Sequence, residues 1–118
     1  MSLFIKRAAL ATTLLISMNT LYAGPSPKPG DTVESCRQIA LQLNWLSRYQ
    51  DRADCTANLD GVGVYFASNY ILANRISEAK ALIDTAIIKT KYAIDISCYG
   101  QDDMKDVVDQ LQKIQKTL

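Results

Sequence analysis

Few side chains in this sequence have the chemistry that enzymes use for proton transfer or nucleophilic attack. The 118 residues include no histidine, which excludes a histidine general base, a Ser/His or Cys/His nucleophile pair and an ordinary zinc site. The segment Gly61-Val-Gly63 lacks the third glycine and the Lys-Ser/Thr pair of a phosphate-binding loop. The sequence therefore contains no standard motif for nucleophilic or phosphate-transfer chemistry.

The carboxylates that lie close together in the sequence are Asp51 with Asp54 and Asp102 with Asp103 and Asp106, the latter followed by Asp109. Paired carboxylates can act as acid and base when burial separates their pKa values. Here the first group lies in a predicted loop and the second at the solvated start of a predicted helix, and neither follows a calcium-loop pattern. We therefore predict no catalytic residue, no metal and no cofactor, and we expect a binding protein rather than an enzyme.

The first 23 residues have the features of a secretory signal peptide. Lys6 and Arg7 precede a short apolar run, and Leu-Tyr-Ala ends the segment at Ala23. An uncleaved anchor is the alternative, but a spanning helix needs about 20 apolar residues. No cysteine lies near the expected cut, so lipid acylation is not expected. We therefore predict a periplasmic protein that is free of the membrane once residues 1–23 are removed.

Residues 24–30 contain all three prolines and two glycines, which predicts a flexible leader before a helical domain of residues 31–118. Two of the 13 basic residues lie in the signal peptide, so the remainder nearly balances the 12 acidic residues. The two signs are interspersed along the chain. This balance argues against nucleic acid or an anionic membrane as the partner.

Four segments of this domain carry apolar residues at helical spacing. They predict helices over about 32–50, from about 55 to 73, from 76 to about 94, and from Asp102 onwards, with short connections between them. Asn74 or Ser77 is the expected cap of the third helix, and Gly100 is expected to end it. The predicted fold is all-α, a small antiparallel four-helix bundle. The apolar stripe of its second helix comprises Leu59, Val62, Phe66, Tyr70 and Ala73.

Three cysteines in an exported chain indicate an oxidising compartment and one disulfide. In an up-down bundle, Cys55 at the start of the second helix and Cys98 at the end of the third lie at the same end. Cys36 lies roughly 20 Å from that end along the first helix, beyond the limit of about 7 Å between bridged Cα atoms. We therefore predict a Cys55–Cys98 disulfide and a buried free thiol at Cys36. If the second helix begins only after Gly63, a Cys36–Cys55 bridge becomes the alternative.

Gly61 and Gly63 interrupt the apolar pattern of the second helix. Each weakens a helix by roughly 1 kcal/mol relative to alanine, so we expect a neighbouring backbone or a partner to pack closely against both. The alternative is that residues 55–63 form a loop and the helix begins after Gly63.

The cysteine and glycine spacing resembles a known family. The layout is an early cysteine, Cys36, followed by Cys55-Thr-Ala-Asn-Leu-Asp-Gly61-Val and then by Cys98, which leads into a helix. This layout is similar to that of the Tai/Rap type of exported immunity proteins, which protect bacteria from type VI secretion amidase toxins. This chain stops after the fourth helix, where the family usually continues to a further cysteine. The resemblance implies a helical, often dimeric periplasmic protein that blocks a secreted cell-wall-degrading hydrolase. The alternative function is an envelope adaptor or chaperone, such as a secretion pilot or a stress holdase.

Exposed aromatic side chains are the expected anchors for such a partner, because binding energy concentrates in them. We predict a partner-binding site at Tyr99 and Gly100, with Trp45 and Tyr49 on the flank of the first helix. The Cys98 disulfide would hold the backbone of Tyr99 rigid. The alternative is that these aromatic side chains fill the ends of the bundle.

Overall fold

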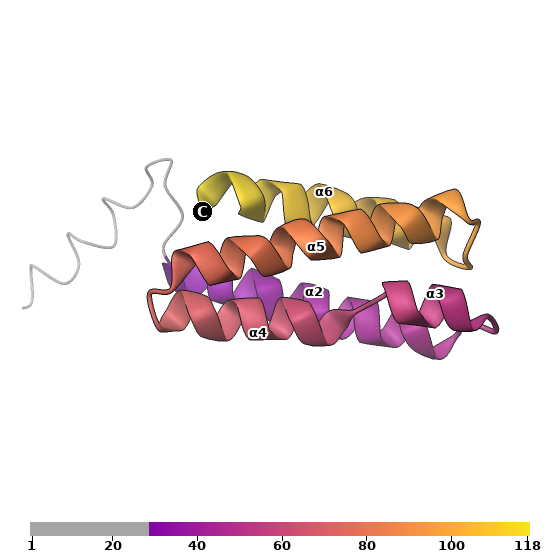
Figure 1. Cartoon of the computed structure of the whole chain (residues 1–118), viewed down its shortest axis with the longest axis horizontal. Helices are drawn as coiled ribbons and strands as arrows, with labels where there is room; N and C mark the ends of the chain where they lie inside the picture. The colour runs from indigo at the N-terminus through magenta and orange to yellow at the C-terminus, as the bar shows by residue number, and fades with distance from the viewer. Residues whose placement is uncertain (1–28) are drawn as a thin grey trace, which may run out of the picture.

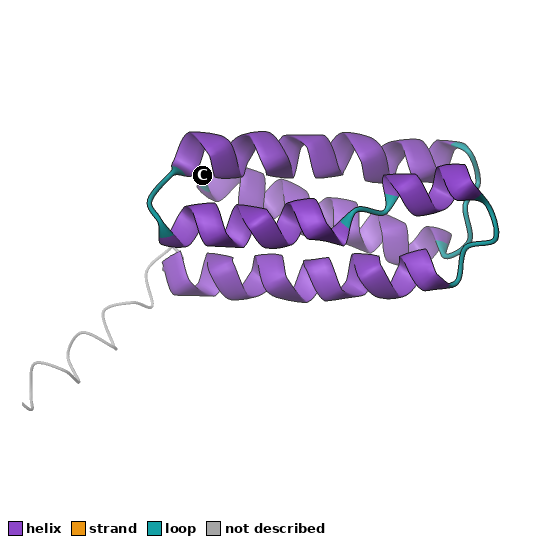
Figure 2. Ribbon diagram, turned by 60° about the horizontal axis from the view of Figure 1, so that its bottom comes forward, coloured by secondary structure: helices purple, strands orange, loops and turns teal. Residues whose placement is uncertain are grey.

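Five helices make up most of residues 29–118, the part of the chain that the computed structural model describes. They are α2 (Pro29–Arg48), α3 (Ala53–Asn58), α4 (Gly61–Leu72), α5 (Ile76–Asp95) and α6 (Gln101–Thr117). The four longer helices alternate in direction and are joined by short loops (Figures 1 and 2). Each of the four packs against two of the others. The predicted antiparallel four-helix bundle is confirmed, and residues 29–118 contain no strand.

The N-terminal boundary of the bundle differs slightly from the prediction. The predicted signal peptide and residues 24–28 of the predicted leader lie outside the described residues. Pro29 and Gly30, which we expected in the leader, belong to α2. Proline is favoured in the first helical turn because its missing N–H would have no helical acceptor there. The helix ends at Arg48, two residues before the expected end.

The second predicted helix is broken into α3 and α4 at Leu59 and Asp60. Asp60 occupies the N-cap of α4, and its Oδ1 accepts a hydrogen bond from the backbone N–H of Gly63 at 3.2 Å. An aspartate at this position satisfies a helix N–H that has no acceptor within the helix. Cys55 therefore lies in a short helix of its own, neither in a continuous second helix nor in a loop.

The face of α4 that packs into the core is not the predicted stripe. Val62 and Phe66 of that stripe are exposed, whereas Val64, Ala67 and Ile71 are buried. Both faces of α4 are apolar, so periodicity alone did not identify the packed face. The tertiary contacts with α2 and α5 selected it.

The turn between α4 and α5 has a residue in the left-handed region. Asn74 has a φ of +60°, its N–H donates to the Ile71 carbonyl, and the N–H of Arg75 donates to the Tyr70 carbonyl. This is a Schellman motif, in which asparagine is the commonest substitute for glycine. Asn74 therefore ends α4, and α5 begins at Ile76 with no side-chain cap, contrary to the prediction of a cap.

The turn between α5 and α6 repeats this motif with Ser97. Ser97 has a φ of +62°, and the N–H of Cys98 donates to the Ala93 carbonyl at 3.0 Å. Gly100, expected to end α5, instead has a φ of +91° at the N-cap of α6. A Cβ there would lie 2.9 Å from Cδ2 of Leu46. Glycine at position 100 thus combines the left-handed backbone with a close approach of α2.

The helices enclose one core. Residues from all five helices contribute to it, and the predicted apolar stripes of α2, α5 and α6 face inward. The largest of the fully buried side chains are Ile39, Leu43, Ile83, Met104, Leu111, Val64 and Val107.

The disulfide prediction is confirmed. Cys55 and Cys98 are bridged, with Cα atoms 5.7 Å apart, at the end of the bundle where α3 meets the α5–α6 turn (Figure 1). Arg52 adds a hydrogen bond at this end, from Nη1 to the Ile96 carbonyl at 2.8 Å. Cys36 is a free, buried thiol, as predicted. Its burial raises its pKa from 9.0 to about 11, because the thiolate would lose its hydration there.

Candidate protein-binding surface

An aromatic stripe runs along the outer side of α2. We define it as Leu41 and Trp45 of α2 together with Tyr49, the residue that follows the end of α2. The three follow one another at four-residue intervals and are 62, 57 and 55% exposed. The rings of Trp45 and Tyr49 meet edge to face, with centroids 5.2 Å apart. The alternative in which Trp45 and Tyr49 fill the ends of the bundle is therefore wrong. Aromatic side chains exposed in a row on one helix are typical of interaction surfaces.

The neighbouring helix α4 is apolar on its outer side as well. Its twelve residues include no charged side chain, although five of them are exposed. A helix that is hydrophobic all round is normally covered on all sides. Here the bundle covers only one side, and α4 leaves exposed Val62, Tyr65, Phe66 and Leu72.

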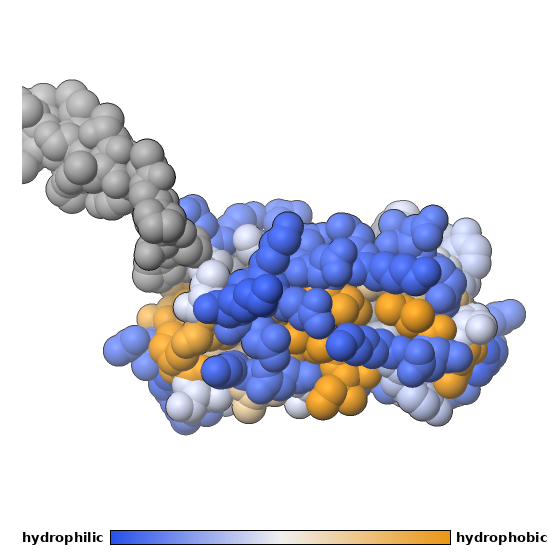
Figure 3. Space-filling view, turned by 90° about the horizontal axis from the view of Figure 1, so that it is seen from above, coloured by the Kyte–Doolittle hydropathy of each residue, from blue (hydrophilic) through white to orange (hydrophobic). Residues whose placement is uncertain are grey.

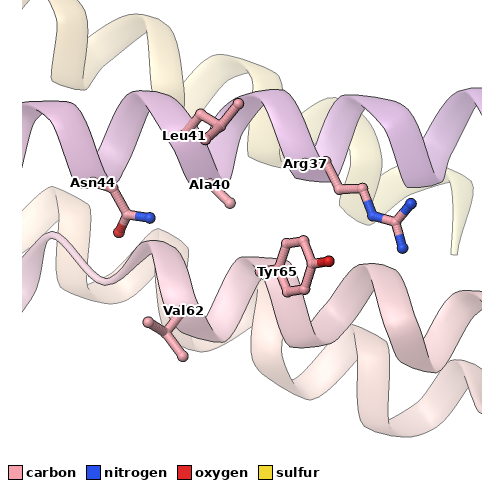
Figure 4. Close-up of a pocket in the computed structure, with 6 residues that line it drawn as sticks. All are labelled: Arg37, Ala40, Leu41, Asn44, Val62 and Tyr65. Carbon is pink, nitrogen blue, oxygen red and sulfur yellow. The ribbon is translucent and has the colours of Figure 1, made fainter.

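A groove lies between these two helices (Figure 4). It has a volume of about 540 Å³ and is open to solvent. The floor contains the small buried residue Ala40, and Arg37 lies at one end, with its guanidinium group toward Tyr65 (Figure 4). We call it the α2–α4 groove; its lining residues are Arg37, Ala40, Leu41, Asn44, Val62 and Tyr65.

Arg37 is held in place by α4. Its Nε donates to Oγ of the buried Ser68 at 3.2 Å, and its Nη2 donates to Oδ1 of Asn69 at 3.3 Å. Its Cζ lies 5.4 Å from the centroid of the Tyr65 ring. A guanidinium group over an aromatic face gains a further cation–π attraction. The charged end of the groove is therefore fixed before any partner binds.

Gly61 brings the two walls of the groove together. A Cβ at this position would clash with the carbonyl oxygen of Ala40 and lie 2.5 Å from Oδ1 of Asn44. The expected close packing at Gly61 is thus found, and the neighbour is α2. At Gly63 the expectation is wrong, because a Cβ there would meet only the carboxylate of Asp60, at 3.1 Å. Gly63 serves the local N-terminal turn of α4 rather than contact between helices.

The turn that carries Tyr99 is rigidly attached to the end of α2. Gln50 accepts a hydrogen bond from the Tyr99 N–H at 3.0 Å and donates one to the Tyr99 carbonyl at 2.9 Å. The disulfide at Cys98 and the bond from Gln101 Nε2 to the Cys98 carbonyl hold the flanking residues. The Tyr99 side chain is nevertheless 70% exposed. The backbone is fixed while the ring faces solvent.

The face formed by α5 and α6 differs from the α2–α4 side. Figure 3 shows rows of hydrophilic side chains there, with separate hydrophobic patches between them. Ile88 and Tyr92 of α5 are exposed.

The carboxylates considered in the sequence, at positions 51, 54, 102, 103 and 106, are all exposed. A hydrogen bond from Arg52 lowers the pKa of the exposed Asp54 carboxyl.

A comparison of the chain with protein-family models, curated proteins and solved structures finds no match. Among residues 29–118, no three His, Cys, Asp or Glu side chains come together as metal ligands would. Within the same residues, no helix is long and apolar enough to cross a membrane.

The structure brings the predicted site residues into one region of the surface. Trp45 and Tyr49 lie on the aromatic stripe, and Gln50 connects its end to the turn of Tyr99 and Gly100. The sequence patterns did not indicate the α2–α4 groove or the place of Arg37 in it. The signal that could have located it was the absence of charge over residues 61–72, which is unusual for a helix with a solvent-facing side.

Proposed function

We propose that this chain is a non-enzymatic, exported protein that binds another protein through the outer side of α2 and α4. The observation that carries the proposal is the exposed apolar outer side of α4 beside the aromatic stripe of α2. Surfaces of this kind on small soluble proteins mark interaction sites. Aromatic residues and arginine are also the residue types enriched at binding hot spots.

The rigidity of this surface favours one specific partner over many unfolded clients. The α2–α4 groove is held by the bonds of Arg37 to α4, and the Tyr99 turn is held by Gln50 and the disulfide. A pre-formed surface loses little conformational entropy on binding. Promiscuous binders instead use flexible, methionine-rich surfaces, and the methionine of the described chain, Met104, is fully buried.

The resemblance to Tai/Rap immunity proteins supplies the class of partner. We propose that the partner is a secreted cell-wall-degrading hydrolase and that binding inhibits it in the periplasm. The Cys55–Cys98 disulfide supports an oxidising compartment. In this proposal the Tyr99 turn and the α2–α4 surface contact the enzyme together, since Gln50 places the turn at the end of the aromatic stripe.

Capture from periplasmic extract tests the proposal, with the mature protein as bait. The matched control is a double variant, Leu41→Gln with Val62→Gln, which makes the α2–α4 groove polar at two exposed positions and leaves the core intact. The expected result is an exported hydrolase that is retained by the wild type and lost with the variant. The purified pair should then show stoichiometric inhibition of peptidoglycan hydrolysis.

Three outcomes would contradict the proposal. Equal retention of the same protein by the wild type and the double variant would show that the α2–α4 groove is not the binding surface. A retained hydrolase whose activity is unchanged at saturating inhibitor would remove the inhibitory function. Weak retention of many unrelated unfolded proteins would favour the chaperone alternative.

A further inference from the structure

We infer that the α2–α4 groove recognises a partner through one carboxylate bound by Arg37, next to an apolar side chain that enters the groove beside Leu41. This inference rests on the proposed binding function and specifies the chemistry of the partner at the same surface. It follows from how Arg37 is held, from the charges around it, and from the residues one helical turn away.

The geometry of Arg37 leaves donors for a ligand. A guanidinium group has five N–H donors, and two of them point to Ser68 and Asn69. Three donors remain, two on Nη1 and one on Nη2, and one from each nitrogen can bind the two oxygens of a carboxylate side by side. The Tyr65 ring and the two bonds fix the plane of the group, so little freedom is lost when a carboxylate binds.

One acid lies near Arg37 on the same helix: Glu34, three residues before it, whose Oε2 accepts a hydrogen bond from Nε2 of Gln38 at 2.8 Å. The ion pairs among residues 29–118 join Arg52 to Asp54, Arg75 to Glu78 and Lys89 to Asp60, and none involves Arg37. The sequence has no Asp or Glu over residues 35–50 of the α2 segment or over 61–72 of α4. A half-buried cation in an apolar groove that forms no ion pair with the nearby Glu34 is complementary to a partner that supplies an acid.

The apolar half of the site lies one turn along α2. Leu41 follows Arg37 by four residues, a spacing that places their Cβ atoms about 5 to 6 Å apart. Val62 lies opposite on α4 and lines the same groove. A partner helix would match this pattern with Glu or Asp three or four residues from Leu, Phe or Trp.

A second copy of this chain fits the groove less well than such a partner. In a two-fold symmetric contact each groove would meet the other. Arg37 would then face a groove that itself contains an arginine and no carboxylate. We therefore commit to an acidic-apolar segment of a different protein.

Selection from a phage-displayed library of random peptides on the immobilised mature protein tests the inference. Peptides are counter-selected on the Leu41→Gln, Val62→Gln double variant so that only groove binders remain. The expected sequences contain Asp or Glu within four residues of Leu, Phe or Trp. Synthetic copies of the best binder, with its acid kept or replaced by the matching amide, are then titrated against the wild type and against Arg37→Gln.

The four titrations form a double-mutant cycle. We expect a roughly tenfold loss of affinity from Arg37→Gln with the acidic peptide, equivalent to about 1.4 kcal/mol, and almost none with the amide peptide. Arg48→Gln is the matched control, because it removes the same charge from α2 outside the groove. Melting temperatures of all variants check that the fold is retained.

Each contrary outcome has a separate meaning. Groove-dependent peptides without an acid, or equal losses from Arg37→Gln and Arg48→Gln, would overturn the role of Arg37 and leave the proposed binding surface standing. If no peptide distinguishes the wild type from the double variant, the proposed surface fails and the inference fails with it. If sedimentation shows a dimer of the wild type that the double variant loses, a second copy is the occupant and the inference is wrong.

Discussion

Replacing Gly61 by alanine tests the packing on which the α2–α4 groove depends. The added Cβ would clash with the carbonyl oxygen of Ala40, which belongs to the backbone of α2, and would press on Oδ1 of Asn44. The Asn44 amide can rotate away because its residue is exposed. The carbonyl of Ala40 cannot, because it is part of the helix. Relief therefore requires α4 to move away from α2.

The magnitude follows from two opposing effects. Overpacking of this kind costs about 1 to 3 kcal/mol. Alanine inside a helix gains about 0.5 to 1 kcal/mol over glycine, and less is recovered here because Gly61 is the first residue of α4. The clash is the larger effect because the obstacle is backbone. We expect a net loss of about 1 to 2 kcal/mol in the free energy of unfolding. For a domain of this size, each 1 kcal/mol lowers the melting temperature by about 4 to 8 °C.

Gly63→Ala is the matched control, since it is two residues away in the same helix. Its Cβ would meet only the carboxylate of Asp60 at 3.1 Å, at the end of a side chain that can adjust. We expect its melting temperature to be unchanged or slightly raised. Both variants are measured by thermal and urea unfolding followed by circular dichroism. A Gly61→Ala protein as stable as Gly63→Ala would refute the close approach of α2 and α4.

Three further predictions concern the cysteines and the Tyr99 turn. Cys55→Ala, which opens a bridge of sequence separation 43, should lower the free energy of unfolding by about 3 to 4 kcal/mol; equal melting temperatures with and without reductant would contradict this. Because the pKa of Cys36 is raised to about 11 in the fold, the unfolded thiol ionises first as pH rises. Between pH 9 and pH 11 the free energy of unfolding of the wild type should therefore fall relative to that of Cys36→Ala, by up to about 2 to 3 kcal/mol. Urea unfolding that gives parallel pH profiles for the two proteins would contradict this prediction. Gln50→Ala removes both hydrogen bonds to the Tyr99 backbone, so amide exchange of Tyr99 should quicken roughly tenfold, and unchanged protection by NMR would show that the disulfide alone holds the turn.

The helices and the disulfide could be predicted because they follow from local patterns. The apolar residues of α2, α5 and α6 lie on one side of each helix, and polar residues cover the other side. Alternating helix direction then placed Cys55 and Cys98 at one end, and the length of α2 argued against Cys36 unless the second helix began after Gly63. These steps needed only helical geometry and the distance limit of a disulfide.

The helix ends were harder to predict because they depend on a few hydrogen bonds. Asp60 begins α4 as its N-cap, where its side chain accepts a hydrogen bond from the N–H of Gly63. Ser97 ends α5 in a left-handed conformation that serine rarely adopts. Gly100 was expected at the end of α5 but begins α6.

The helical class and the bundle follow from the sequence, because the apolar side of an amphipathic helix is the side that is buried. The cysteine pairing depended in addition on where the second helix begins. The sequence did not determine which side of α4 is buried, because α4 has apolar residues on both sides and no charge to mark the exposed one. The buried side of α4 is set by its packing against α2 at Gly61, which is a tertiary contact. The missing side chain of Gly61 lets α2 approach that edge of the helix, which turns Val64 and Ile71 inward and leaves Val62, with Tyr65, at the α2–α4 groove.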